Sequence, residues 1–282
     1  MHRRTLLFAI SSSTSDTAIT AAAEAAREQQ AHLACLLLKT LPGMPYFAYG
    51  ASAYGAMAVP DEWLETLQSC RTAQSARAAE VEALLARSNT AGDVQYVTAS
   101  DADIRLMAAR RALTCDIAEA AEGLREDPEV FRDAVHGILF GSPVPLMVNG
   151  SPFEARKRVF LAWNSSLSAS RAAHAALPYF KAAEEVVIGC FDPDMSDARD
   201  GEDPGADMAA WLSHHGCTVT LSQFPTGGHD TGSAIQDRAR EAGADLVVMA
   251  SHVPNITDHI WPSNGGTIAS QARASVLVVR DN

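Results

Sequence analysis

Two stretches of the sequence decide the fold: Thr5–Ala23 reads TLLFAISSSTSDTAITAAA, and Arg158–Ala176 reads RVFLAWNSSLSASRAAHAA. At a constant offset of 153 residues, the apolar residues 6–8 align with 159–161, and the serines at 12, 13 and 15 align with those at 165, 166 and 168. Each stretch is a short apolar run, a serine-rich turn and an alanine-rich segment. This order predicts a buried strand, a turn whose serines cap a helix, and the helix itself.

The rest of the chain repeats the same alternation of short apolar runs and helical segments. Strands are expected at 4–10, 32–39, 93–98, 115–118 and 144–148, and again at 158–163, 185–191, 217–223, 245–251 and 275–280. Apolar strands separated by helices are typical of parallel sheets covered on both faces. The sequence therefore predicts an α/β fold of two tandem domains, each a five-stranded parallel sheet with helices on both faces. The turn-forming stretch Asn149–Pro152 places the domain boundary, giving domains 1–150 and 151–282.

Composition and charge exclude several classes of protein. The chain has 282 residues, 47% of them hydrophobic, and a net charge of −12. Both halves are acidic, so neither has the basic excess that nucleic-acid or anionic-membrane binders usually show. The five cysteines form no C-x-x-C motif. Cys35, Cys115 and Cys190 lie inside or beside strand-like runs and are expected as small buried hydrophobic residues of a reducing cytoplasm. The start, Met1–Arg4, faintly resembles an export signal, but a first buried strand is the expected reading.

The halves differ at residues 41–60, which form an insertion in the first domain. This segment, LPGMPYFAYGASAYGAMAVP, holds three of the five tyrosines and precedes an expected helix at about 61–87. Small residues alternate with aromatic ones, so the segment could pack over its own or the partner domain. The alternative is a ligand lid or a protein contact.

Three motifs together resemble the universal stress protein family. They are VFLAWNSS at 159–166, AREAGADLVVMASH at 239–252 and SVLVVR at 275–280. The segment LFGSPVPLMV at 139–148, followed by LAWNSS, is similar to the tandem-domain bacterial members of that family. The resemblance covers both halves and implies the adenine nucleotide alpha hydrolase-like fold, a five-stranded parallel α/β sheet, in agreement with the strand pattern.

The resemblance also implies a nucleotide site in the second domain. ATP-binding members carry G-x-x-G, nine residues and G-[ST] after the fourth strand, because glycines let backbone N–H groups close around phosphates. Here Ala250, Val253 and Ser263 occupy the three glycine positions, and Asn164 stands where family members usually have Asp. The loop is thus degenerate, and the expected cofactor is none or weakly bound ATP or AMP. The candidate binding residues are Ala162, Trp163, Asn164, Ala250, Ser251, His252, Val253, Ser263, Asn264, Gly265, Gly266 and Thr267.

The first domain is a poorer candidate for phosphate. Its residue matching Asn164 is Ser11, and no glycine loop follows its fourth strand. Acidic residues follow that strand instead, and they would repel a phosphate: Glu119, Glu122, Glu126, Asp127 and Glu129. No nucleotide is expected there.

Other motifs are better read as structural. Thr226–Thr231 resembles a pyrophosphate loop of AMP-forming ligases but follows the third strand of its domain, so we expect a turn with Asp230 or Thr231 capping a helix. The histidines lack a zinc spacing, and the acidic segment 192–207 lacks a calcium-loop spacing. No catalytic residue and no metal ligand are predicted.

These observations favour a non-enzymatic, cytoplasmic stress-response protein that acts by binding. The alternative is an adenine-nucleotide-binding member that uses only its second domain. The expected partner is an unidentified protein or small ligand, with no nucleic acid and no membrane. The two domains are expected to pack as an intramolecular pseudo-dimer, with a homodimer as a further form.

Overall fold

The computed structural model describes residues 4–43, 60–196, 200–228, 230–251 and 275–280. The first half contains β1 (Thr5–Ile10), α1 (Asp16–Glu28), β2 (His32–Thr40), α2 (Asp61–Arg87), β3 (Gly92–Ala99), α3 (Asp101–Ala112), β4 (Ile117–Ala120), the short 3-10 helix η2 (Glu122–Glu126), α4 (Pro128–Gly141) and β5 (Leu146–Val148). The second half contains β6 (Arg158–Trp163), α5 (Leu167–Ala182), β7 (Glu185–Phe191), α6 (Ala206–His214), β8 (Val219–Phe224), α7 (Thr231–Glu241), β9 (Leu246–Ser251) and β10 (Ser275–Arg280).

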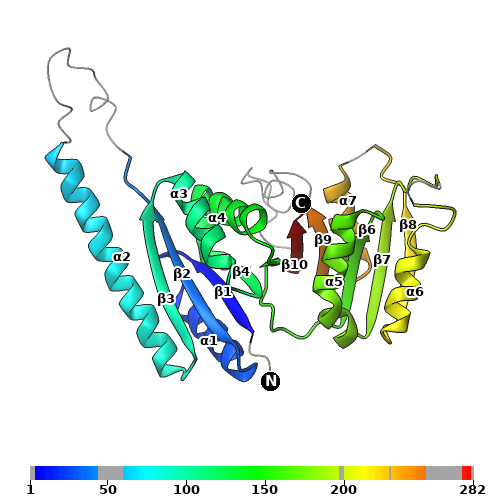
Figure 1. The fold of residues 1–282 in the computed structure, drawn as a ribbon, viewed down its shortest axis with the longest axis horizontal. Coiled ribbons are helices and arrows are strands. Elements are labelled where there is room, and N and C mark those ends of the chain that lie inside the picture. Colours follow the sequence, from blue (N-terminus) through cyan, green and yellow to red (C-terminus); the bar gives the residue numbers. More distant parts are fainter. Residues whose placement is uncertain (1–3, 44–59, 197–199, 229, 252–274, 281–282) are drawn as a thin grey trace, which may run out of the picture.

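All ten strands belong to one sheet (Figure 1). Across the sheet, the first half runs β3-β2-β1-β4-β5 and the second half continues as β10-β9-β6-β7-β8. Counted outward from the centre, both halves have the same order, because β5, β4, β1, β2 and β3 correspond to β10, β9, β6, β7 and β8. Pairing is parallel within each half, and the halves meet through the antiparallel pair β5–β10. The predicted α/β class with five parallel strands in each half is confirmed. Because the sheet continues through this seam, the bounds 1–150 and 151–282 stay a prediction.

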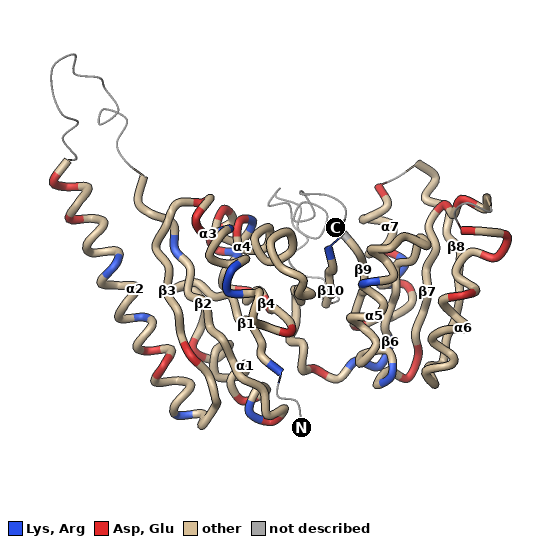
Figure 2. The backbone as a smooth tube through the Cα atoms, viewed as in Figure 1, with Lys and Arg blue, Asp and Glu red and all other residues tan. Residues whose placement is uncertain are grey.

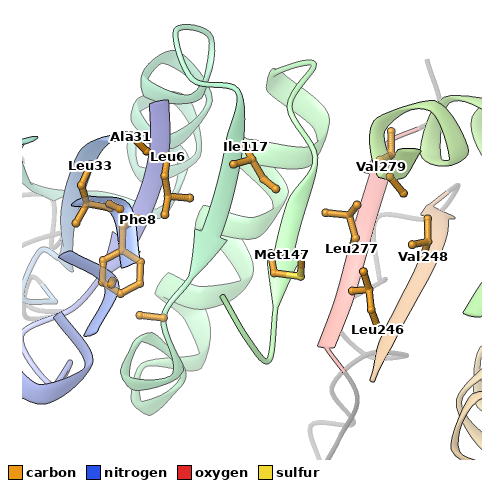
Figure 3. Close-up of a cluster of buried hydrophobic side chains, with 14 of the residues drawn as sticks. Leu6, Phe8, Ala31, Leu33, Ile117, Met147, Leu246, Val248, Leu277 and Val279 are labelled. Carbon is orange, nitrogen blue, oxygen red and sulfur yellow. The ribbon is translucent and has the colours of Figure 1, made fainter. Parts of the chain in front are cut away.

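Helices cover both faces of the sheet and bury two apolar layers. One face is packed by α1, α2, α5 and α6, and the opposite face by α3, α4 and α7. On the first face the buried side chains run without a break across the seam, where Leu277 of β10 lies opposite Met147 of β5 (Figure 3). Both side chains are fully buried. The core therefore joins the halves rather than closing around each one.

An aspartate holds the start of the central strand in each half. In the first half a carboxylate oxygen of Asp116 accepts a hydrogen bond from the Thr5 backbone N–H at 2.6 Å. In the second half Asp245 does the same for the Arg158 N–H at 3.3 Å. Since the first N–H of a strand otherwise lacks a ladder partner, the repeated aspartate satisfies it in both halves.

The turn after the central strand breaks the constant offset of the sequence repeat. Ser15 caps α1 by accepting from the Ala18 N–H, and Ser166 caps α5 by accepting from the Ala169 N–H. Ser15 therefore corresponds to Ser166, and not to Ser168 as the alignment predicted. The first-half turn, residues 11–15, is two residues longer than the second-half turn, residues 164–166.

The expected strands agree with the structure to within two residues at every end, and α2 begins and ends where a helix was expected. The shift that matters is at β4, which lies two residues later than expected at both ends. Asp116 belongs to the preceding turn, so the strand spans Ile117–Ala120 and contains Glu119. The prediction that Glu119 follows the strand and faces a phosphate position was wrong. Most of the aromatic insertion, residues 44–59, lies outside the described residues.

Candidate functional site

The second-half candidate site begins at the carboxyl ends of three adjacent strands. β9 pairs with β6 on one side and with β10 on the other. Trp163 at the end of β6 and Ala250 near the end of β9 are both partly buried and pack against the same core layer. Ala162 packs against the opposite layer. The strands therefore place the backbone of Ala162, Trp163, Ala250 and Ser251 at the same edge of the sheet, and a binding role for these residues stays a prediction.

Asn164 follows β6 and shapes the turn into α5. Its side-chain oxygen accepts hydrogen bonds from the Ser166 hydroxyl at 2.7 Å and from the Ser166 N–H at 3.3 Å. The intervening Ser165 has a φ of +54°, in the left-handed region. Asn164 is thus a turn residue. Its amide nitrogen is exposed and has no partner among the described residues, so it keeps a donor for a ligand.

The remaining candidate residues of the second domain, His252, Val253, Ser263, Asn264, Gly265, Gly266 and Thr267, lie outside the described residues. The degenerate glycine loop therefore stays a prediction.

Arg280 is a charged residue at this edge that the sequence analysis missed. It ends β10, where it pairs in register with Ser251 of β9. Its guanidinium donates to the Phe140 carbonyl oxygen and lies 5.7 Å from the centroid of the Phe140 ring. Because Phe140 is near the carboxyl end of α4, Arg280 ties the last strand of the second half to the first half. The two residues come together because β10 pairs with β5, the strand that follows α4.

The corresponding edge of the first half is closed by its own backbone. Gly123 in η2 lies so close to the β1–α1 turn that a Cβ atom there would be 2.6 Å from the Thr14 Cα. The Ser11 hydroxyl donates to the Gly123 carbonyl oxygen at 3.0 Å, and the Ser11 N–H donates to the Thr14 hydroxyl at 3.1 Å. The longer turn therefore fills the space between β1 and the β4–α4 connection.

Acidic side chains surround this closed edge. Asp127 caps α4 by accepting from the Val130 N–H, and its carboxylate lies 3.9 Å from the Lys39 amino group. Glu122, Glu126 and Glu129 also lie in this connection or the first turn of α4. Basic and acidic segments are interspersed over both halves of the described chain (Figure 2).

The segment that resembles a pyrophosphate loop is a capped turn. Asp230 is the N-cap of α7 and accepts from the Ser233 N–H at 2.8 Å. Asp192, after β7, accepts hydrogen bonds from the Thr226 N–H and hydroxyl, and these hold the pKa of Asp192 below its ordinary value. The structural reading of this segment is confirmed.

The described residues hold no group of three or more His, Cys, Asp or Glu side chains placed to bind a metal ion. Within the same residues, no helix is both long and apolar enough to cross a membrane. All five cysteines are free thiols, and burial raises the pKa of Cys35 to about 12, which makes that thiol a poor nucleophile.

Comparison with known proteins supports the resemblance over part of the second half. The model of the universal stress protein family matches residues 222–280. The second half is therefore similar to that family over these residues. The match starts in β8 and ends with β10, so it includes the β9 edge and the residues that follow it.

Solved structures extend the comparison of the fold. A universal stress protein from Archaeoglobus fulgidus aligns at a TM-score of 0.62 and 14% identity, covering 99% of this chain and 97% of that one. A putative universal stress protein from Pseudomonas aeruginosa aligns at 0.45 and 12% identity, covering 99% and 93%. A universal stress protein in complex with cAMP aligns at 0.30 and 19% identity, covering 45% of this chain and 98% of that one. The first alignment shows that the two-half α/β fold is shared along the whole chain.

Proposed function

We propose that this protein acts in the stress response by binding, in the cytoplasm, and not by catalysis. The contact of Gly123 with the Thr14 backbone carries the proposal, because it removes one of the two nucleotide positions that the repeat would otherwise offer. The second position has lost the glycines of the family motif. With the fold kept and phosphate binding weakened at both positions, this protein is better suited to recognise a protein partner or a small ligand than to hydrolyse ATP.

Native mass spectrometry of the purified full chain tests this proposal. We expect a co-purified small ligand or a bound protein, and no phosphate release when ATP is added. Release of phosphate from ATP above the background of an Asn164→Ala variant would contradict the non-catalytic role.

A second candidate function is adenine-nucleotide binding by the second half alone. The unpaired amide nitrogen of Asn164, at the end of β6, favours it. At a concentration of 100 times Kd, a nucleotide would raise the free energy of unfolding by about 2.7 kcal/mol. Thermal shifts with ATP, AMP and cAMP would detect that change.

Two variants at position 164 locate such a site. Asn164→Ala removes the amide nitrogen and the oxygen that Ser166 uses, so the nucleotide shift should shrink. Asn164→Asp keeps the oxygen acceptor and should keep the turn. A shift that is identical in wild type and Asn164→Ala would place the nucleotide elsewhere.

A further inference from the structure

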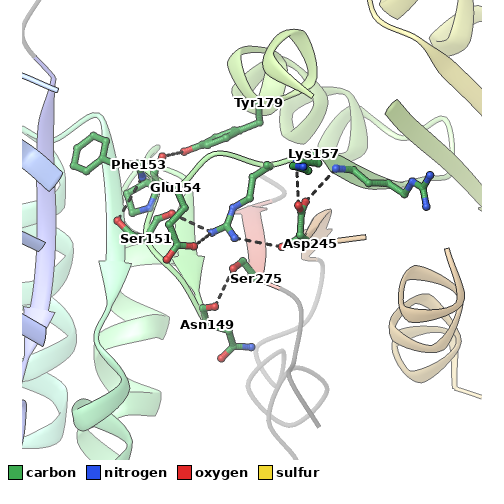
Figure 4. A network of polar contacts seen from close by, with 11 residues as sticks. Asn149, Ser151, Phe153, Glu154, Lys157, Tyr179, Asp245 and Ser275 are labelled. Atoms are coloured by element: carbon green, nitrogen blue, oxygen red, sulfur yellow. Dashed lines mark hydrogen bonds and ion pairs between the residues drawn. The ribbon is translucent and has the colours of Figure 1, made fainter. Parts of the chain in front are cut away.

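Strand pairing at the seam is completed within the chain. β5 pairs with β10, and beside them the Ser275 hydroxyl donates to the Asn149 carbonyl oxygen at 2.9 Å (Figure 4). The Tyr179 hydroxyl of α5 donates to the Pro152 carbonyl oxygen, also at 2.9 Å, and so holds the segment between the halves against the second half. A further strand cannot be added at the seam. Among the described residues, the sheet is open only at its two outer strands, β3 and β8.

The two outer strands differ in how they are protected. An edge strand presents backbone N–H and C=O groups that no neighbouring strand uses, and proteins usually guard it with charges, glycine, proline or a covering segment. β3 begins with Gly92, and its Asp93 forms ion pairs with Arg111 at 2.6 Å and with His32 at 2.7 Å. β8 reads VTLSQF, without a charge, a glycine or a proline. The edge at β8 is therefore the less guarded of the two.

Hydrogen bonds to β7 use alternate residues of β8. The Thr218 carbonyl oxygen accepts from the Val186 N–H at 2.8 Å. Six residues later, the Phe224 carbonyl oxygen accepts from the Asp192 N–H at 3.0 Å. Because a parallel ladder engages every second residue, the residues in between turn their backbone groups away from β7. The outward-facing residues are Val219, Leu221 and Gln223.

This spacing makes β8 complementary to a second copy of itself. When two copies run antiparallel with Leu221 opposite Leu221, Val219 of each copy lies opposite Gln223 of the other. Each of these pairs then exchanges two N–H···O hydrogen bonds. Thr220 lies opposite Ser222 in the pairs between them, and hydroxyl pairs of this kind stabilise antiparallel ladders. No pair brings like charges together.

Leu221, at the centre of this arrangement, is partly in contact with solvent. Its side chain is 37% exposed. It lies on the sheet face that α6 covers, because a Cβ atom on Gly205, the residue before α6, would be 2.7 Å from the Leu221 Cδ1. Thr220 and Gln223 are exposed as well. Pairing would therefore bury the open part of Leu221 against the same residue of the other copy.

The carboxyl end of β8 lies beside an acidic segment. The hydrogen bond from Asp192 to Phe224 fixes the start of this segment. The chain then continues through four further acidic residues, Asp194, Asp200, Glu202 and Asp203 (Figure 2). Arg238 lies 5.3 Å from the centroid of the Phe224 ring, but its charge is paired with Glu241 at 2.6 Å. This end of the strand is therefore negative.

The amino end of β8 has a different charge balance. It lies next to the start of β7, where Glu185 is paired with Arg158 at 2.8 Å and Glu184 with Lys157 at 3.7 Å. Lys181, in the last turn of α5, adds a positive charge at this end. In an antiparallel pair, the acidic segment of each copy lies towards Lys181 of the other, so charge complementarity favours this direction.

We propose that two copies of this chain associate through β8, antiparallel and with Leu221 at the two-fold axis, so that their sheets join into one. The interface is separate from the binding edge proposed for the second half, because β7 lies between β8 and the strands of that edge, β6 and β9. A two-fold contact of this kind uses the free edge of β8 in both copies, so the assembly stops at a dimer.

Sedimentation equilibrium of the full chain tests this interface. One copy weighs 29.9 kDa, and we expect the wild type to approach twice that mass as its concentration is raised through the micromolar range. Leu221→Lys places like charges opposite each other at the axis, so it should raise the dissociation constant of the dimer at least about tenfold. The matched control is Tyr96→Lys on the other edge strand, where the side chain is 47% exposed; it should leave the dimer unchanged.

Exchange of charges tests the antiparallel direction. Lys181→Glu should weaken the dimer, because it sets an acidic side chain towards the acidic segment of the other copy. Adding Asp194→Lys in the same chain should recover part of the loss. Independent, additive effects of the two substitutions would show that these residues do not face each other in the dimer, and would contradict the proposed arrangement.

A cross-link provides a measurement that does not depend on the folding of Leu221→Lys. Thr220→Cys combined with Ser222→Cys sets thiols opposite each other in non-hydrogen-bonded pairs, whose Cα atoms lie about 4.5 Å apart and within reach of a disulfide. After mild oxidation this variant should run as a dimer in denaturing, non-reducing electrophoresis, and the wild type should not. A wild type that stays monomeric at every concentration, a folded Leu221→Lys variant that dimerises like the wild type, or loss of the dimer in Tyr96→Lys would overturn the proposal.

Discussion

Gly123 shows how one residue decides whether an edge of the sheet is open. A Cβ atom at this position would lie 2.6 Å from the Thr14 Cα and 2.9 Å from the Thr14 nitrogen, which are backbone atoms that cannot move aside cheaply. We therefore expect Gly123→Ala to lower the free energy of unfolding by roughly 1–3 kcal/mol, as overpacking usually does. Urea denaturation measures the change.

Gly43 provides the matched control. A Cβ atom there would meet nothing within 4 Å, so Gly43→Ala should change stability little. Equal effects of the two substitutions would show that the contact of Gly123 with Thr14 does not constrain the first half.

The buried acid at position 119 also predicts a pH dependence of global stability. The pKa of Glu119 is about 8 in the folded chain and near 4.5 when unfolded, so between these values the folded state holds a proton that the unfolded state has lost. Stability contributed at this site therefore falls as pH rises through that range. Glu119→Gln should raise the melting temperature at about pH 8 and leave it nearly unchanged at about pH 4.5. A gain that is the same at both values would mean that burial does not perturb the carboxyl group.

At the scale of elements, the two halves differ in the turns that follow their central strands, β1 and β6. The first-half turn has two extra residues and is packed against η2. The second-half turn is shorter and is closed by the side chain of Asn164. Corresponding strands and helices are thus joined by turns of different length. The Asn164 amide nitrogen in the second turn has no partner among the described residues.

Glycines at the three family positions after β9 should allow phosphate binding in the second half. The triple change Ala250→Gly, Val253→Gly and Ser263→Gly returns backbone N–H access, and Pro254→Arg adds a charged donor. A charged hydrogen bond contributes about 1.5–3 kcal/mol, so ATP affinity should rise at least about tenfold over wild type. Calorimetric titration of both proteins measures this ratio. Micromolar ATP binding by the wild type would contradict the reading of these substitutions as a loss of function.

At the scale of the whole molecule, the seam joins two halves into one core. Met147 is fully buried beside Leu277, and both belong to the apolar layer that crosses from one half to the other. Met147→Ala should lower the free energy of unfolding by about 2–5 kcal/mol. Because the sheet is continuous, hydrogen exchange should show β2 and β7 destabilised together.

Met195 is the control for this substitution, since its side chain is 56% exposed. Met195→Ala should shift stability by no more than about 0.5 kcal/mol. If Met147→Ala destabilised β2 and left β7 unchanged, the two halves would be independent folding units.

Most of the fold could be predicted from local pattern. Short apolar runs, serine caps and alanine-rich helices are encoded within a few residues, so the bounds of β6 and α2 match the expected ones. The contact of Arg280 with Phe140 could not be predicted, because the two residues are 140 positions apart in the chain. The place of Glu119 inside β4 was missed because a shift of two residues in one short strand moves it from a loop into the sheet.

By itself, the sequence determined the repeated α/β pattern and the places of the strands and helices, because each depends on residue types at short spacing. Only the tertiary structure decided that the halves share one sheet through β5–β10, that Gly123 closes the first edge and that Arg280 contacts Phe140. These depend on backbone approach and burial between distant segments, which no local pattern records.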